Sequence, residues 1–471
     1  MKLSRRRFLA NSAALAAVTT SARAQPAGSE LIPAPAQATI IPGQRQTDVW
    51  AFNGTVPGPV LRFRQGERAR ITVTNRLAQD TTVHWHGLRL PNAMDGVPHV
   101  TQAPIAPGGR FIYEFDLPDA GTFWYHPHAR SAEQVERGLS GAFIVEERDP
   151  PAVDRDVVWV LDDWRLTQDG AIAGEFGNRM DASHAGRLGN AVTINGRVPD
   201  RFAVQAGERL RLRLINAANA RVFGLEFGGL APTVVALDGH PLEPHAPPAG
   251  RVVLGPGMRA DLILDIPVSA GAALPVTDTF YARGHYKLVD LAVDGVRREA
   301  LLTQPVRLPS NPTSVPDLAS AERVVVELGG GMMDPRLMRA MRERGGQPDP
   351  EMIRTMRERM TAGQIWTLNG QSVMDHHHAP LLTLVRGRSY IFTFNNDTAW
   401  HHPMHLHGMA FRVLTRNGQA VPYGEWRDTT LIDPAERVEI GLVADNPGDW
   451  MLHCHILEHQ EAGMMGTIRV S

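Results

Sequence analysis

Apart from the run of three histidines at 376–378, eight of the 19 histidines stand in four His-x-His pairs, a spacing that favours metal binding. Residues two apart on a β-strand point to the same side, so each pair would direct two imidazoles toward one place. One such pair is weak evidence, because surface histidines also fall at this spacing by chance. Four pairs are strong evidence for a metal cluster. The pairs are His84 and His86, His126 and His128, His405 and His407, and His453 and His455.

The only cysteine among 471 residues, Cys454, stands between the two histidines of the last pair. On a strand its thiol would point away from both neighbours, so thiolate and imidazoles could bind different metals on opposite faces. A soft thiolate with two histidines and a distant methionine is the blue-copper arrangement. A lone structural cysteine is the alternative, but it leaves the flanking histidines unexplained. The candidate partners of the thiolate are His402, His459 and Met464.

These residues must be positioned by strands, and the chain repeats a strand pattern three times. Residues 52–76, 194–218 and 368–397 each run from Asn-Gly through an apolar strand, a glycine turn and an alternating strand. Alternation predicts one buried face per strand. We therefore expect an all-β chain of three sandwich or barrel domains, at 36–148, 150–310 and 320–471. The histidine pairs fall in the first and third domains, so the second is expected to hold the outer two together.

Composition agrees with a β-rich fold and excludes some partners. The chain has 44 Gly and 35 Pro, which suggests many turns. Its net charge is −2 with both signs spread along the sequence, so neither a nucleic-acid partner nor a membrane-surface partner is expected. A single cysteine cannot form an internal disulfide.

The N-terminus reads as an export signal. A basic start, SRRRFLA, precedes a modest apolar stretch and an Ala-x-Ala end at about Ala24. Paired arginines before Phe8 are typical of the twin-arginine route, so we expect residues 1–24 to be a twin-arginine signal peptide read by that export machinery. The stretch is too short to span a bilayer. The mature protein is therefore expected to be periplasmic or secreted. A disordered basic tail is the alternative.

Residues 329–361 form a methionine-rich, helical-looking stretch that we interpret as an insertion in the third domain. Met352, Met356 and Met360 stand four apart and would share one helical face. Such a stripe often packs in a core. Here it is interleaved with Arg, Glu, Asp and Gly, and thioether is a soft donor suited to Cu(I). These three methionines are therefore a candidate Cu(I) substrate site.

The motifs HWHG, WYHPH, HPMHLHG and HCHILEHQEAGMM stand in this order along the chain, which resembles the bacterial three-domain multicopper oxidases, the family of laccases and cuprous oxidases. The resemblance implies cupredoxin-like Greek-key domains and four copper ions. It implies a type 1 copper on His402, Cys454, His459 and Met464, and a type 2 copper on His84 and His405. It implies a type 3 pair on His86, His126, His128, His407, His453 and His455.

The resemblance also implies a reaction. Reducing substrates, either Cu(I) or phenols and amines, would give single electrons to the type 1 copper, and molecular oxygen would be reduced to water at the trinuclear cluster. A role in copper tolerance is expected. Asp95 stands where the family has an acidic residue near the cluster, and we expect it to relay protons; a plain turn aspartate is the alternative. Where the family often has a glutamate this chain has Gln460, which cannot titrate.

Two functions of another class compete with the enzyme. One is an exported, non-enzymatic scaffold of the same fold that has lost its copper ligands, and the intact ligand set argues against it. The other is a copper-sequestering protein that uses the methionine and histidine tracts. Bound copper that turns blue and consumes oxygen would separate the enzyme from both.

Overall fold

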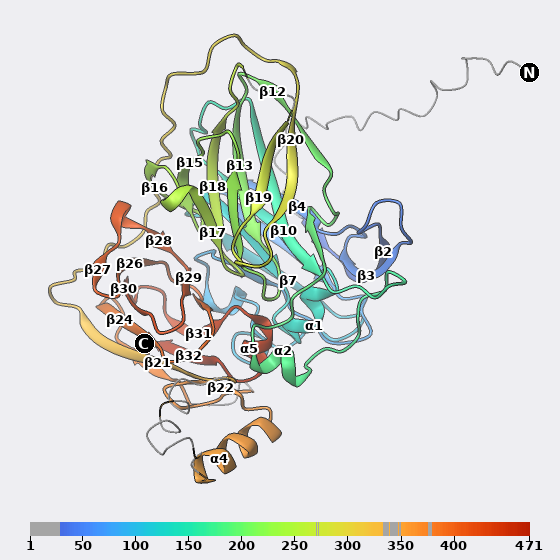
Figure 1. Cartoon of the computed structure of the whole chain (residues 1–471). Helices are drawn as coiled ribbons and strands as arrows, with labels where there is room; N and C mark the ends of the chain where they lie inside the picture. The colour runs from blue at the N-terminus through green and yellow to red at the C-terminus, as the bar shows by residue number, and fades with distance from the viewer. Residues whose placement is uncertain are drawn as a thin grey trace, which may run out of the picture.

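The computed structural model describes residues 29–269, 271, 273–332, 339, 347, 350–374 and 379–471. The chain folds into three β domains that meet at a common centre (Figure 1). This confirms the predicted all-β, three-domain architecture. The expected signal peptide, residues 1–24, lies outside the described residues. For the domain boundaries we propose the predicted ranges, with the first domain extended to Ser29 because the strand at Ser29–Leu31 pairs within it.

The first domain has a three-stranded sheet, a two-stranded sheet and a four-stranded sheet. In the first of these sheets, Ala69, Ile71 and Val73 are fully buried while Arg68 and Arg70 are exposed, as the alternation predicts. The three-stranded sheet runs β1 (Ser29–Leu31), β5 (Arg68–Thr74), β7 (Arg110–Asp116). The pair is β2 (Pro33–Ala38) and β3 (Thr47–Phe52). The four-stranded sheet runs β4 (Gly58–Arg64), β9 (Gly141–Glu146), β8 (Gly121–His126), β6 (His84–His86).

The second domain is a sandwich of a six-stranded and a five-stranded sheet, at the top of Figure 1. The six-stranded sheet runs β11 (Ala191–Ile194), β10 (Arg155–Trp164), β13 (Arg209–Asn216), β18 (Arg259–Asp265), β15 (Thr233–Leu237), β16 (His240–His245). The five-stranded sheet runs β12 (Arg201–Ala206), β20 (Tyr286–Val296), β19 (Ala273–Asp278), β14 (Phe223–Phe227), β17 (Arg251–Leu254).

Strand β13 departs from the predicted one-sided burial, because all eight of its residues are buried. The arginines on its polar face meet acidic partners instead of water. Arg211 lies 2.7 Å from Glu147 of the first domain and 2.6 Å from Asp261. Buried charges need such partners. The alternation therefore marks a face covered by the first domain, and not a solvent face.

The third domain has a seven-stranded and a five-stranded sheet. The larger runs β22 (Trp366–Leu368), β21 (Glu322–Gly330), β24 (Ser389–Asn396), β30 (Arg437–Val443), β26 (Phe411–Arg416), β27 (Gln419–Ala420), with β28 (Trp426–Arg427) also paired to β26. The smaller runs β23 (Leu382–Leu384), β32 (Met465–Val470), β31 (Gly448–Cys454), β25 (His402–Leu406), β29 (Thr429–Ile432).

The described helices are short except for one. They are α1 (Ser131–Glu136), α2 (Arg179–Ser183), α4 (Pro350–Thr361) and α5 (Leu457–Glu461), with single 3₁₀ turns at Asn92–Met94, Pro248–Gly250 and Pro422–Gly424. Helices α1 and α2 both lie against α5, so one helix from each domain meets at the centre (Figure 1). No helix among the described residues has the length and apolar character needed to cross a membrane.

The methionine-rich stretch lies between β21 and β22, which pair antiparallel, so the chain leaves and re-enters the sheet at adjacent points. Helix α4 lies below the third domain in Figure 1 and confirms that the insertion is partly helical. Residues 333–338, 340–346 and 348–349 of the predicted insertion lie outside the described residues.

The first and third domains touch directly. The Asn92 side-chain amide donates to the Asp449 carbonyl at 2.7 Å, and that of Asn446 donates to the Leu90 carbonyl at 3.0 Å. One apolar core cluster also runs through both domains. This contact brings the sheet that carries β6 and β8 against the sheet that carries β25 and β31.

Candidate metal centres

The eight paired histidines converge in one buried cluster at the seam between the first and third domains. Strand pairing aligns them: His84 lies opposite His126 across β6 and β8, and His405 lies opposite His453 across β25 and β31. Across the seam, the ring centroids of His84 and His407 are 3.9 Å apart, and those of His86 and His405 are 3.7 Å apart. The two domains therefore contribute to a single site, as the sequence predicts.

Four of these rings are oriented alike, because their Nδ1–H donates to a backbone carbonyl. The contacts are His84 to Asp95 at 2.8 Å, His126 to Pro127 at 3.1 Å, His405 to Asp428 at 2.9 Å and His453 to Cys454 at 2.9 Å. A proton on Nδ1 leaves Nε2 with a free lone pair. Within the described part of the chain, Nε2 of the first three rings has no hydrogen-bond partner although it is buried.

His86 is oriented the other way. Its Nε2 contacts the Asp428 carboxylate and the Thr429 hydroxyl, each at 3.1 Å, and its buried Nδ1 has no partner among the described residues. The remaining rings also direct nitrogens inward. His407 and His453 bring their Nε2 atoms within 3.1 Å of each other, and both nitrogens of His128 and of His455 are buried without a described partner.

Burial favours the neutral form of most of these imidazoles. It lowers the pKa of His86, His128 and His455 well below the usual range, and neighbouring histidines lower it further. The pKa of His405 is lowered by burial as well. Neutral imidazoles with unpartnered nitrogens are candidate metal ligands, because a buried polar atom otherwise requires a hydrogen-bond partner.

A second group lies on the other face of β31. The Cys454 sulfur is 3.5 Å from Nδ1 of His402 and 3.7 Å from Nδ1 of His459, and these two nitrogens are 3.3 Å apart. The outer nitrogens are occupied: His402 Nε2 bonds the Thr398 hydroxyl at 2.8 Å, and His459 Nε2–H donates to the His184 carbonyl at 2.6 Å. Two nitrogen lone pairs and a thiol therefore face one point.

The environment of this group is apolar. Burial raises the pKa of the Cys454 thiol and lowers the pKa of His459 to about 3. A buried thiol loses its proton only when a cation replaces it, so the group needs a metal to become a thiolate site. The predicted fourth ligand, Met464, is fully buried in the same core cluster as Cys454, and its carbonyl accepts a hydrogen bond from the Cys454 amide at 3.0 Å.

Comparisons with known proteins agree with this geometry. Three family models described as multicopper oxidase match residues 35–150, 155–269 and 346–471. The multicopper oxidase MmcO of Mycobacterium tuberculosis is 31% identical over 95% of this chain and 89% of its own length. This chain belongs to the multicopper oxidase family.

This multicopper oxidase is also similar to a solved structure and to a copper resistance protein. The crystal structure of a multi-copper oxidase from Pseudomonas thermotolerans matches with a TM-score of 0.82 and 36% identity, covering 94% of this chain and 99% of that one. Copper resistance protein A of Escherichia coli is 25% identical over 89% of both chains.

Family membership makes the protein a copper-dependent oxidoreductase that uses oxygen and a reducing substrate. Both residue groups fit copper, because imidazole nitrogens suit the metal in the cluster and a thiolate with imidazoles suits it at Cys454. The unpartnered nitrogens are available as metal ligands. A non-enzymatic scaffold or a purely copper-sequestering protein is therefore not favoured.

The structure adds residues that sequence reasoning missed. Asp428 and Thr429 contact His86 and His405 behind the cluster, and the His184 carbonyl orients His459 from the second domain. Trp366 covers the thiol group: its ring centroid lies 4.1 Å from that of His459, and its Nε1–H donates to the Ala182 carbonyl at 2.6 Å. No local sequence pattern marks these residues, because each acts on a histidine distant in the chain.

Asp95, the predicted proton relay, lies at the histidine cluster, and Gln460 lies in α5 next to His459. Asp95 is buried, and its Oδ2 accepts a hydrogen bond from His407 Nδ1–H at 2.9 Å while its carbonyl accepts one from His84. Gln460 is buried and bonds the Ser131 hydroxyl at 3.3 Å. Next to it, the Glu461 carboxylate accepts from the Ala132 amide at 2.9 Å, and desolvation raises its pKa to about 7.

A cavity of about 320 Å³ lies beside α5. Its lining includes Glu458 and Glu461, which stand on either side of His459 in the sequence, and also Met360, Met374 and Arg179. The end of α4 therefore reaches the neighbourhood of the thiol group. Of the three predicted methionine sites, Met360 lines this cavity; the structure places positions 352 and 356 in α4.

Proposed function

We propose that this oxidase takes single electrons from a reducing substrate at the group of His402, Cys454 and His459 and delivers them to oxygen at the eight-histidine cluster. Copper bound at the two groups would supply the one-electron steps and the four-electron reduction of oxygen to water. The observation that supports this best is on β31: Cys454 faces one group, while His453, its neighbour, faces the other. The two groups are joined by consecutive peptide units.

We assign the ligands of four copper ions on the family pattern, and the contacts described above support the assignment. Type 1 copper is assigned to His402, Cys454, His459 and Met464, type 2 copper to His84 and His405, and the type 3 pair to His86, His126, His128, His407, His453 and His455. In this assignment the second domain contributes no ligand.

For protons, we propose that Asp95 is the relay. Its carboxylate lies directly behind His407, so it can hold a proton next to the place where oxygen is reduced. Gln460 cannot take this role, because an amide does not titrate at physiological pH. The contacts of Asp95 with two cluster histidines favour the relay over a plain turn aspartate.

For the reductant, we propose Cu(I). Positions 352, 356 and 360 stand one turn apart in α4, and Met360 lines the cavity next to His459 together with a second thioether, Met374. The carboxyl groups of Glu458 and Glu461 line the same cavity and offer oxygen ligands to a metal ion there. Soft thioethers beside hard carboxylates suit a copper ion better than an uncharged phenol.

Replacing Met352, Met356 and Met360 together by leucine should lower Cu(I) oxidation several-fold or more and leave the oxidation of a small phenol near the parent rate. Leucine keeps the volume and the helix propensity while removing the sulfur donor, so α4 should persist. The measurement is oxygen uptake with each substrate, the phenol assay being run without added copper.

The deciding quantity is the rate of Cu(I) oxidation divided by the rate of phenol oxidation. A lower ratio with unchanged circular dichroism supports a Cu(I) site. An unchanged ratio would mean that these methionines only pack, and the protein would then be an ordinary laccase.

The proposed function as a whole is tested by oxygen uptake of the copper-loaded protein. Steady uptake with Cu(I) or with a phenol, together with a blue absorption band, is the expected result. Copper binding without oxygen consumption would instead indicate a sequestering protein.

We further propose that the protein acts outside the cytoplasm in copper tolerance. The twin-arginine-like N-terminus supports export by the twin-arginine machinery, and similarity to a protein named for copper resistance supports the role in tolerance. Cell fractionation tests the location: lysine in place of the arginines before Phe8 should retain the protein in the cytoplasm.

A further inference from the structure

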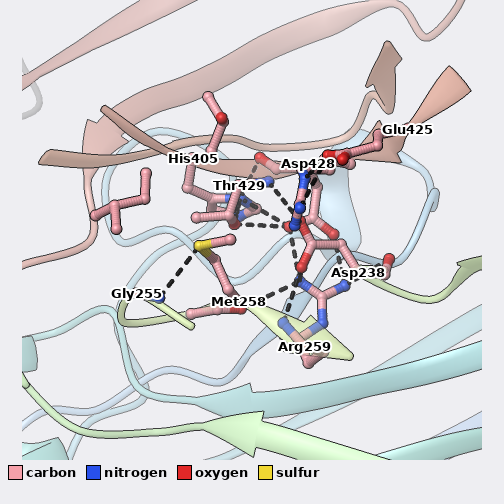
Figure 2. Close-up of polar contacts among 12 residues, drawn as sticks. Asp238, Gly255, Met258, Arg259, His405, Glu425, Asp428 and Thr429 are labelled. Atoms are coloured by element: carbon pink, nitrogen blue, oxygen red, sulfur yellow. Dashed lines mark hydrogen bonds and ion pairs between the residues drawn. The ribbon is translucent and has the colours of Figure 1, made fainter. Parts of the chain in front are cut away.

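Behind the histidine cluster lies a buried ion pair, Arg259 with Asp428, for which the ligand assignment gives no role (Figure 2). Arg259 Nη1 donates to Asp428 Oδ1 at 2.7 Å, and Nη2 donates to Oδ2 at 2.6 Å. The pair is therefore bidentate, and both side chains are removed from water. A buried pair of this kind is weak evidence for stability, so its position asks for another explanation.

The carboxylate of Asp428 touches the cluster directly. Its Oδ1 lies 3.1 Å from His86 Nε2, and its backbone carbonyl accepts from His405 Nδ1–H at 2.9 Å. The Thr429 hydroxyl donates to Asp428 Oδ1 at 2.7 Å and contacts both rings, at 3.1 Å and 3.0 Å. Asp428 and Thr429 thus orient His86 of the first domain and His405 of the third.

The guanidinium of Arg259 is fully occupied, and its partners come from all three domains. Nε–H donates to the Thr122 carbonyl of the first domain at 3.2 Å. The remaining N–H groups donate to the carbonyls of Gly257 and Asp238 of the second domain, at 3.1 Å and 2.9 Å, and to Asp428 of the third. Arg259 has five N–H donors, so none is left over.

Two glycines show how closely the backbone approaches this pair. A Cβ at Gly87, directly after His86, would stand 2.3 Å from Arg259 Nη2, and Gly87 has a φ of 87°. A Cβ at Gly257 would stand 2.9 Å from His86 Cε1 and 2.8 Å from His455 Cδ2. Only glycine fits at either position, so the chain is shaped to bring Arg259 against the cluster.

We propose that Arg259 and Asp428 form a positioning clamp for the histidine cluster, in which the carboxylate fixes the ring nitrogen that His86 presents to copper and the second domain holds that carboxylate in place. His86 is the ring whose Nε2, in contact with this carboxylate, is turned away from the cluster. This inference rests on the proposed function. It gives the second domain a part in the oxygen-reducing site although that domain contributes no ligand.

The test compares Asp428→Asn with a matched control, Glu147→Gln. Each change replaces a buried carboxylate that pairs with an arginine of the second domain. Asp428 pairs with Arg259, and Glu147 pairs with Arg211 at 2.7 Å. The contacts found for Glu147 in the described structure are not with cluster histidines. A merely structural role predicts similar effects of the two changes.

We expect Asp428→Asn to keep the blue type 1 band and to alter the spectrum of the type 3 copper pair, to which His86 is assigned. Its kcat for oxygen reduction should fall about 10- to 100-fold, the range for loss of an outer-shell partner, with KM for the reductant near the parent value. Glu147→Gln should keep the parent spectrum and kcat. A folded Asp428→Asn with the parent spectrum and kcat would overturn the clamp, as would the same change in Glu147→Gln.

Arg259→Lys keeps the inference testable if Asp428→Asn does not fold. Lysine keeps the charge but cannot bind both carboxylate oxygens in fixed geometry, so a smaller change of the same kind is expected. A folded Arg259→Lys protein with the parent spectrum and kcat would overturn the clamp. Failure of the proposed function looks different: the parent protein itself would then show no type 2 copper signal.

Discussion

Replacing Cys454 by serine is expected to bleach the copper-loaded protein and to stop turnover. Serine is close to cysteine in size, so the core around β31 should persist, but its hydroxyl is not a soft ligand and stays protonated at this buried position. Cys454 is the only thiol in the chain, and its sulfur is the atom that His402 and His459 both face. Visible absorption and oxygen uptake measure the two effects.

The type 2 copper signal serves as the internal control, since the eight histidines are unchanged in Cys454→Ser. We expect that signal to remain in the bleached protein. A serine variant that keeps the visible band would show that the colour arises elsewhere and that the type 1 assignment is wrong.

Replacing His405 by alanine should have the opposite pattern: the blue band stays and oxygen reduction is lost. His402, Cys454 and His459 are untouched, whereas the cluster loses a ring that lies 3.7 Å from His86 by centroids and bridges the two domains. The loss of kcat should exceed the about 10- to 100-fold typical of an outer-shell partner, because a proposed ligand itself is removed.

His401→Ala is the matched control for this experiment. His401 directly precedes His402 in the sequence. Its side chain is 36% exposed, and its Nε2 lies 3.5 Å from Asp433 rather than in the histidine cluster. We expect parent oxygen uptake from His401→Ala. Parent-level uptake from His405→Ala would remove His405 from the trinuclear site.

The two groups were predictable because strand periodicity is a local property. Two histidines two positions apart predict a strand on which both rings point to the same side. His84 and His86 of β6 have this arrangement. The same rule predicted that the Cys454 thiol points away from His453, although β31 ends at Cys454 and His455 follows the strand. The repeated strand pattern likewise gave the three β domains.

The clamp was not predictable, because nothing local marks it. Arg259 and Asp428 lie 169 residues apart in different domains, Arg259 at the start of β18 and Asp428 between β28 and β29. The arginines of β13 show the same limit: alternation told which residues share a face, but not that Glu147 of another domain covers that face. Pairings between domains depend on how the domains dock, which periodicity does not encode.

The two centres differ in how many domains supply their proposed ligands, and this sets the order in which a heated sample should fail. The thiol group is built from β25, β31 and α5 of a single domain, whereas the histidine cluster exists only while two domains stay in register. Partial loosening at the seam between the first and third domains should therefore leave a protein that is still blue but no longer reduces oxygen. Colour alone would overstate the working fraction of an aged preparation, and oxygen consumption would report it.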